Sequence, residues 1–240
     1  MGVGAPNPSA VGWYKDTSLT ASRTKTRVDC YTTYMNILSL CDHSGNILKP
    51  WADAGHACVS VDLRHQGSPY SGVSPYHCSV SEFDWGILDW DMIFAFPPCT
   101  HTAVSGAGWF RSKGPRKAAE AFGTLADCLE IIERANCPWM VENPVSTFST
   151  YWREPDHTFH PWYWGDMEQK KTCLWVGGGF RMPERTHDIG GIGSLWSEVT
   201  TIDPLEIRTS CADMSPSEDR GNKRSVTPMG FSEAVFAANV

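Results

Sequence analysis

The segment FAFPPCTHTAVSG (residues 94–106) places a cysteine directly after two prolines at the end of an apolar run. The run DMIFAF is typical of a buried strand, and each proline fixes its own φ angle and restricts the residue before it. Cys99 is therefore predicted on a stiff backbone at the carboxyl end of a strand, where ligands bind in an open α/β sheet. Two interpretations of Cys99 follow: a positioned nucleophile, or a small buried side chain in a tight turn.

Two acidic residues also follow predicted strands. Asp62 ends the run ACVSVD, which comes after a first strand NILSLC and a turn DHSG, and Glu142 follows the run PWMV. An acid at the end of a second strand can accept hydrogen bonds from both hydroxyls of a ribose. The turn contains one glycine, Gly45, where dinucleotide sites have three, which disfavours NAD and ATP and leaves a methionine-linked nucleoside. Both acids also fit ordinary turn or strand-end positions.

The elements that would position these residues alternate along the chain. Apolar runs predict strands at 36–41, 57–62, 91–96, 138–144 and 171–176. Helical patterns lie between the strands at 46–55 and from Pro115 onward, and a further helical pattern ends the chain. Strand, helix and strand at these intervals predict parallel βαβ units, and hence an α/β fold with a doubly wound, mostly parallel sheet.

Composition limits the functional classes. With 240 residues, 41% of them hydrophobic, the chain can bury the core of one domain. We find no long apolar run and no secretory leader, so we expect no membrane span and a cytoplasmic, monomeric protein. The nine cysteines are odd in number and include no C-x-x-C pair, so we expect reduced thiols and no metal site.

Charge gives a mixed indication about nucleic acid. The net charge of −7 argues against a surface covered in phosphate-binding side chains. The stretch WFRSKGPRK nevertheless carries four cations and no acid, namely Arg111, Lys113, Arg116 and Lys117. A nucleic-acid contact and a solvated helix start explain this stretch equally well.

Taken together and in order, the motifs resemble those of DNA cytosine-C5 methyltransferases, most closely a compact, phage-type branch of that family. The matching segments are ILSLCDHSG, PPCTHTAVSGAGWF, VENP, HPWYWGDMEQKKTCLW and RSVTPMGFSEAVFA, which lie within residues 36–240. The resemblance implies a Rossmann-like S-adenosylmethionine-dependent methyltransferase fold with a small recognition appendage. It also implies S-adenosylmethionine as the cofactor and DNA as the partner.

The resemblance assigns the catalytic roles. Cys99 would add to C6 of a cytosine turned out of the duplex, and C5 would then attack the methyl group of the cofactor. Glu142 would hold N3 and the exocyclic amine, while Pro98 and Asn143 would shape the two catalytic turns. Lys171, within QKKT, is the candidate for the family's arginine that holds the cytosine O2.

The same resemblance implies two binding sets. The residues implied for the cofactor are Cys41, Asp42, His43, Ser44, Gly45, Asp62, Leu63 and Pro97. The residues implied for DNA are Ser105, Arg111, Lys113, Arg116 and Lys117, with further phosphate contacts from Lys170, Arg181, Arg185, Lys223 and Arg224.

These assignments divide the chain into four parts. We expect an N-terminal arm at 1–26, a catalytic methyltransferase domain at 27–176 and a small target-recognition region at 177–222. Residues 223–240 would form a C-terminal helix that returns to the catalytic domain. The recognition region is short, so we expect a short recognised DNA sequence.

The chain departs from the family pattern at three places. His43 stands where a glycine is usual, Cys41 where an aromatic residue is common, and Thr100 where glutamine usually follows the cysteine. A lysine at the QKKT position also lacks the planar fork of arginine.

Three alternatives remain open from the sequence. His43 near the sulfonium could accommodate a modified cofactor that carries a carboxylated methyl group. Cys99 with His101 could form a thiol hydrolase, although no oxyanion turn or orienting acid is apparent. The chain could also be a non-catalytic nucleoside- or DNA-binding module in which Cys99 is structural.

Overall fold

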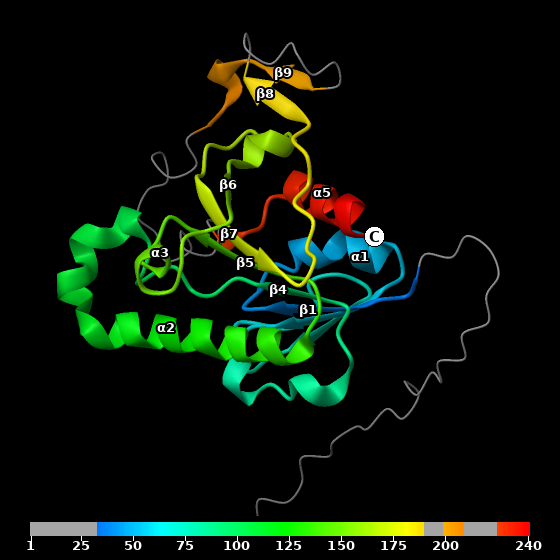
Figure 1. Ribbon diagram of the computed structural model, residues 1–240, viewed down its shortest axis with the longest axis vertical. Helices are drawn as coiled ribbons and strands as arrows, with labels where there is room; N and C mark the ends of the chain where they lie inside the picture. The colour runs from blue at the N-terminus through cyan, green and yellow to red at the C-terminus, as the bar shows by residue number, and fades with distance from the viewer. Residues whose placement is uncertain (1–32, 190–198, 209–224) are drawn as a thin grey trace, which may run out of the picture. The chain divides into compact units, whose positions relative to one another are not determined.

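The computed structural model describes residues 33–189, 199–208 and 225–240 (Figure 1). The described residues belong to one compact unit. The predicted arm at 1–26, much of the predicted recognition region, and Lys223 and Arg224 lie outside the described residues.

A seven-stranded sheet in the order β3-β2-β1-β4-β5-β7-β6 forms the centre of the fold. The first five strands in this order are parallel, β7 runs antiparallel to β5, and β6 runs antiparallel to β7. The strands are β1 (Asn36–Leu40), β2 (Ala57–Val61), β3 (Val73–Tyr76), β4 (Met92–Ala95), β5 (Trp139–Pro144), β6 (His157–Phe159) and β7 (Thr172–Gly177). The predicted α/β fold with a doubly wound, mostly parallel, Rossmann-like sheet is thus confirmed.

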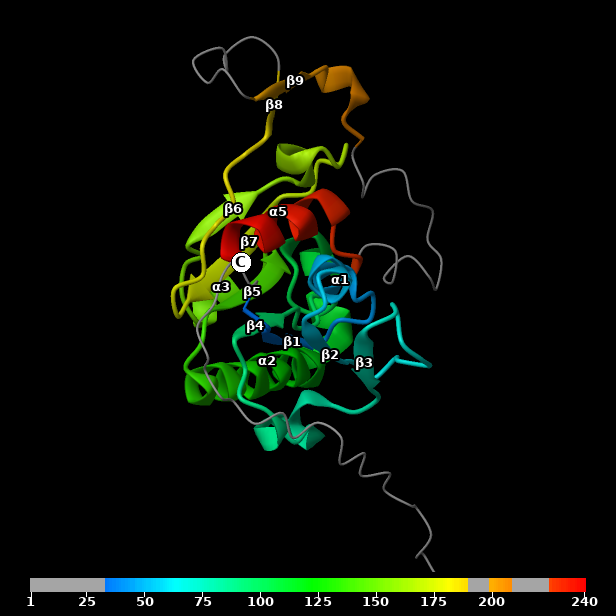
Figure 2. The same cartoon turned by 90° about the vertical axis from the view of Figure 1, so that its right-hand side faces the viewer.

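Helices cover both faces of the sheet (Figures 1 and 2). The long helix α2 (Phe110–Ala135) lies on one face, and α1 (Lys49–Asp53) and α5 (Met229–Asn239) lie on the other. The shorter helices are α3 (Phe148–Tyr151) and the 3-10 turns η2 (Asn46–Leu48), η3 (Val80–Glu82), η4 (Trp85–Ile87), η5 (Val104–Trp109), η6 (Pro161–Trp164) and η7 (Pro204–Glu206).

Alternation along the strands fills a core on each face. Leu38 of β1 packs in the core that α2 covers, while its neighbour Ile37 packs in the core of Trp51 and Phe231. Strands buried on both faces are apolar at nearly every position, which is why the runs at β1 and β4 could be recognised from the sequence.

Helix α2 changes direction at Gly114. This glycine has a φ of 78° and a ψ of 167°, outside the helical region, and Pro115 follows it. A side chain at this φ would be strained, so glycine allows the first turn to bend away from the rest of the helix. The prediction that a helix begins at Pro115 is confirmed for the long part of α2.

The sequence missed some short elements. The five predicted strands match β1, β2, β4, β5 and β7 to within one residue at each end, but β3 and β6 were not predicted. The region 177–222, predicted as a small target-recognition region, contains among its described residues a two-stranded parallel sheet of β8 (His187–Ile189) and β9 (Thr200–Ile202). Among the described residues, no helix combines the length and the apolar character that crossing a bilayer requires.

Candidate active site

The residues singled out from the sequence gather at one edge of the sheet. Parallel strands β1, β2, β4 and β5 end at this edge, and antiparallel β7 begins there, because Thr172 pairs with Pro144. Loops that carry Asp42, Asp62 and Cys99 follow the ends of β1, β2 and β4, and Glu142 lies within β5 near its end. The topology therefore places the predicted cofactor and catalytic residues on the same side of the fold.

The turn that carries Cys99 is fixed at both ends. Before it, the amide of Phe96 donates to the Leu40 carbonyl over 2.9 Å. After it, the carbonyl of Cys99 accepts from the amides of Thr102 (3.1 Å) and Ala103 (2.8 Å), so Cys99 begins a helical turn. Cys99 is half-buried at this position.

Asn143 joins the cysteine turn to the neighbouring strand. Its side-chain Nδ2 donates to the carbonyl of Pro97 over 2.7 Å, and the residue is 1% exposed. This bond connects positions 46 apart in the sequence and brings the end of β5 against the Pro97–Pro98 turn. Asn143 itself lies within β5, and the catalytic roles of Asn143 and Pro98 stay predictions.

Glu142 lies in a low-dielectric position at the end of β5. Its side chain is 16% exposed, and Lys170 Nζ lies 3.8 Å from Oε1. Burial raises the pKa of Glu142, and the positive charge of Lys170 opposes that rise without cancelling it. The raised pKa extends the pH range over which the carboxyl keeps its proton, and a protonated carboxyl can donate one hydrogen bond and accept another.

The lysine beside Glu142 is Lys170, whereas the resemblance implies Lys171. Lys171 is exposed, and its charge acts on His160 and Cys173. Consecutive residues of an extended segment point to opposite sides, so only one of the two lysines faces Glu142. The motif QKKT alone does not say which one.

Most of the other described thiols are poor candidates for a nucleophile. Burial raises the pKa of Cys58 to about 12 and that of Cys137 to about 11. It also raises the pKa of Cys78 and Cys173. A thiol with a raised pKa carries little thiolate near neutral pH.

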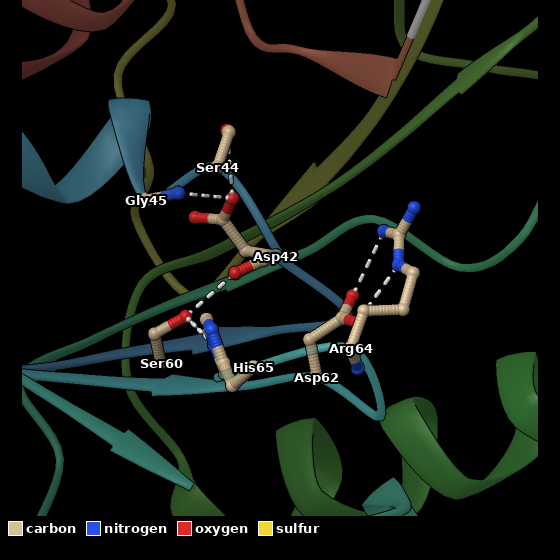
Figure 3. A network of polar contacts seen from close by, with 7 residues as sticks. All are labelled: Asp42, Ser44, Gly45, Ser60, Asp62, Arg64 and His65. Atoms are coloured by element: carbon tan, nitrogen blue, oxygen red, sulfur yellow. Dashed lines mark hydrogen bonds and ion pairs between the residues drawn. The ribbon is translucent and has the colours of Figure 1, made fainter. Parts of the chain in front are cut away.

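The turn after β1 is built around Asp42 (Figure 3). Its Oδ1 accepts from the amide of Gly45 (2.8 Å) and from Ser44 Oγ (3.0 Å), and its Oδ2 accepts from Ser39 Oγ (2.8 Å). Burial raises the pKa of Asp42, and these hydrogen bonds oppose the rise. The carboxyl that the sequence analysis assigned to the cofactor is thus engaged within the turn itself.

Gly45 and Cys41 allow the chain to turn here. Gly45 has a φ of 68°, and an added Cβ would lie 2.6 Å from Pro69 Cγ. Cys41 has a φ of 56°, which is uncommon for a residue with a side chain. The single glycine of the turn is therefore required by close packing against the loop at Pro69.

A second set of hydrogen bonds connects this turn to Ser60 of β2 (Figure 3). Ser60 Oγ lies 2.6 Å from the Asp42 carbonyl and 2.8 Å from His65 Nε2. Ser60 has one hydroxyl proton, which it donates to the carbonyl, so His65 donates from Nε2. Burial lowers the pKa of His65, which favours this neutral ring. Neither Ser60 nor His65 was singled out from the sequence.

Asp62 follows β2 as predicted, but its carboxylate forms an ion pair with Arg64 (Figure 3). Oδ1 accepts from Arg64 Nε (3.0 Å) and from the Arg64 amide (2.8 Å), and Oδ2 accepts from Nη2 (3.0 Å). Burial disfavours the ionised form, but the contacts with Arg64 outweigh it and hold the pKa of Asp62 below its ordinary value. Leu63 beside it is 63% exposed, and His43 is also exposed.

Several cations predicted to bind DNA have partners within the protein. Lys113 Nζ donates to the Thr100 carbonyl over 2.7 Å, and Lys117 pairs with Glu120 over 2.7 Å. Arg185 pairs with Asp188 over 3.1 Å, and Arg181 Nη2 donates to the Val240 carbonyl over 3.3 Å. Ser105, Arg111 and Arg116 are exposed.

Within the described ranges, no three His, Cys, Asp or Glu side chains come together as metal ligands.

Comparison with known proteins gives structural matches alone. No protein-family model and no curated protein matches the chain. A prophage-encoded protein of E. coli, described as a DNA modification methyltransferase, is 12% identical with a TM-score of 0.44, covering 60% of this chain and 46% of that one. The CcbJ methyltransferase from Streptomyces caelestis is 14% identical with a TM-score of 0.30, covering 52% and 49%. The chain thus spans about half the length of these structures.

Proposed function

We propose that the protein transfers a methyl group from S-adenosylmethionine to C5 of cytosine in DNA, with Cys99 as the nucleophile. The observation that carries the proposal is the 2.7 Å hydrogen bond from Asn143 Nδ2 to the Pro97 carbonyl. It ties the turn that holds a thiol to the strand end that holds a buried, protonation-prone carboxyl. A thiol and an acid held on adjoining strand ends are the two groups that conjugate addition to a cytosine ring requires.

Each side chain has a defined task in this reaction. The Cys99 thiolate forms a bond to C6, and the displaced electron pair moves through the ring toward N3, which takes a proton from Glu142. The second oxygen of Glu142 accepts from the exocyclic amine. C5 is then nucleophilic and would form a bond to the methyl carbon as the bond from that carbon to the cofactor's sulfur breaks, with S-adenosylhomocysteine as the leaving group. Loss of the C5 proton to solvent expels the Cys99 thiolate, and Glu142 recovers its proton from N3.

The proposed cofactor site lies at the ends of β1 and β2. The exposed Leu63 side chain offers an apolar surface for an adenine, and Asp62 offers a carboxylate for ribose hydroxyls. The cofactor supplies a methyl group on a positively charged sulfur. Asp62 fits this role only where the ribose displaces the Arg64 guanidinium from its carboxylate.

This competition gives a prediction for Asp62 and Arg64. Asp62→Ala should weaken S-adenosylmethionine binding by about tenfold or more, because the ribose loses its charged acceptor. Arg64→Ala should leave binding unchanged or tighten it, because the ribose no longer displaces an ion pair. Isothermal titration calorimetry measures the dissociation constant of S-adenosylmethionine for each variant. Weaker binding by Arg64→Ala would instead make the arginine part of the cofactor site.

The proposed reaction is tested by mass analysis of the product. DNA that contains cytosine is incubated with the protein and S-adenosylmethionine, digested to nucleosides and analysed. We expect 5-methylcytosine. A product with a carboxylated methyl group, formed only when a carboxylated cofactor is supplied, would support the modified-cofactor alternative. Unmodified DNA, with cofactor binding intact in calorimetry, would indicate a non-catalytic nucleoside-binding module.

A further inference from the structure

A lysine and a glutamate form a largely buried pair in the candidate active site. Lys170 Nζ lies 3.8 Å from Glu142 Oε1, and each side chain is 16% exposed. The proposed reaction takes a proton from Glu142 and later returns it, and it gives Lys170 no task. A charged group that is held beside an acid and away from solvent is a candidate to take part in that exchange.

Backbone contacts fix the segment that carries Lys170. Before it, the Gln169 amide donates to the Arg208 carbonyl and the Arg208 amide donates to the Met167 carbonyl, each over 2.9 Å. After it, Thr172 Oγ1 donates to the Lys170 carbonyl over 3.1 Å. Thr172 also begins β7, the strand that pairs with β5. The lysine is therefore held on both sides, close to the strand end that carries the acid.

Lys170 is the charge that acts most directly on Glu142. Burial raises the pKa of Glu142, and among the described residues the charge that opposes this rise is that of Lys170. Cys173 of β7 lies within electrostatic reach of Glu142, but burial raises the pKa of this thiol, so it stays neutral. Lys171 is exposed, and its charge acts on Cys173. The turn after β4 carries Cys99, the proposed nucleophile.

A lysine at this place can do what an arginine could not. An ammonium group can release a proton to a neighbouring base, whereas a guanidinium keeps its charge in proteins. The separation of 3.8 Å exceeds a direct hydrogen bond, but the flexible four-carbon stem lets Nζ approach the carboxylate when a base fills the site. Lys170 can therefore serve as a proton source as well as a fixed charge.

We propose that Lys170 supplies the proton that Glu142 passes to N3 of the target cytosine. The inference rests on the proposed function for the identity of the base and of the nucleophile. As Cys99 adds to C6, an N–H bond of Lys170 breaks and an O–H bond forms at Glu142 Oε1, and this proton then moves to N3. On elimination the proton returns by the same route, which restores the ammonium. Lys170 acts through Glu142, so it is a positioning residue for the proton.

This relay extends the supply of protons to pH values at which Glu142 is ionised. Without it, transfer depends on the proton that Glu142 itself holds, and the rate falls about tenfold per pH unit above the pKa of that carboxyl. Lys170→Arg keeps the charge that opposes the raised pKa but releases no proton. Lys170→Met removes both, so its rate should begin to fall at a higher pH than that of Lys170→Arg.

The test is single-turnover methyl transfer into cytosine-containing DNA by the full chain, at saturating DNA and S-adenosylmethionine, across pH. Dividing each variant's rate by the wild-type rate at the same pH removes the ionisation of Cys99, which all share. For both Lys170 variants we expect this ratio to be level at low pH and to fall about tenfold per pH unit above the Glu142 pKa. A ratio for Lys170→Arg that does not change with pH would make Lys170 a fixed charge and overturn the inference.

Two controls separate a proton relay from a general effect of the substitutions. Lys49 of α1 forms an exposed ion pair with Asp53, so Lys49→Arg and Lys49→Met should each give a ratio near one at every pH. In a Glu142→Gln background the relay has no carboxylate to act through, so adding Lys170→Arg should change the residual rate little. A pH-dependent effect in that background would contradict a relay through Glu142. Thermal melting confirms that each variant is folded.

Failure of the relay and failure of the proposed function give different results. Wild type that methylates cytosine, together with a pH-independent ratio for Lys170→Arg, overturns the relay and leaves the proposed function intact. Wild type that transfers no methyl group to cytosine overturns the proposed function, and the relay with it.

Discussion

Cys99→Ser is expected to lower methyl transfer to cytosine by at least about a thousandfold, because a serine hydroxyl is a far weaker nucleophile than a thiolate. Binding of S-adenosylmethionine should be unchanged, since the proposed mechanism has Cys99 act on the base. Radiolabel transfer into DNA measures the first effect and calorimetry the second. Cys78→Ser replaces another half-buried cysteine and should keep activity near wild type.

The covalent adduct between Cys99 and cytosine that this prediction assumes can be trapped. With 5-fluorocytosine in the target strand, fluorine at C5 replaces the proton whose loss expels Cys99, so the adduct should persist through denaturing electrophoresis. The wild-type protein should form this complex and Cys99→Ser should not. An active wild-type protein that forms no complex, or a serine variant with near-normal transfer, would refute the covalent mechanism.

Glu142→Gln is expected to slow transfer by at least about a hundredfold, the usual effect of losing a positioned acid or base. Glutamine retains the shape of the side chain but cannot give a proton to N3. Cofactor affinity should be unchanged, because Glu142 lies at the end of β5 and the proposed cofactor residues follow β1 and β2. Weaker cofactor binding with normal single-turnover transfer would contradict this placement.

The raised pKa of Glu142 makes the same variant informative about stability. A carboxyl whose pKa is higher in the folded state stabilises the fold while it is protonated, and that contribution is lost as pH rises through the folded value. Wild type should therefore lose stability relative to Glu142→Gln as pH rises from the ordinary glutamate pKa through the raised one. Melting temperatures of wild type and Glu142→Gln across this pH window test the sign of the stability difference. Lys170→Met removes the charge that opposes the rise, so it should extend the window to higher pH.

Local patterns in the sequence determined the fold class and the positions of the main candidate residues. Apolar runs identified β1, β2, β4, β5 and β7, because strands buried on both faces are apolar at nearly every position. Pro115 correctly indicated where the long part of α2 begins. Asp62 and Glu142 could be placed at strand ends because each adjoins such a run, and Cys99 because only two prolines separate it from one.

Only the tertiary structure decided which partners these residues have. Short β3 and β6 depend on pairing with β2 and β7, and their own residues carry no strong pattern. Side-chain orientation in the folded chain decides that Lys170, rather than Lys171, lies near Glu142. It also decides the hydrogen bond from Asn143 to Pro97 and the ion pair between Arg64 and Asp62. Sequence periodicity reports which face a residue is on, whereas hydrogen bonds and ion pairs are fixed by the packing of whole strands and loops against one another.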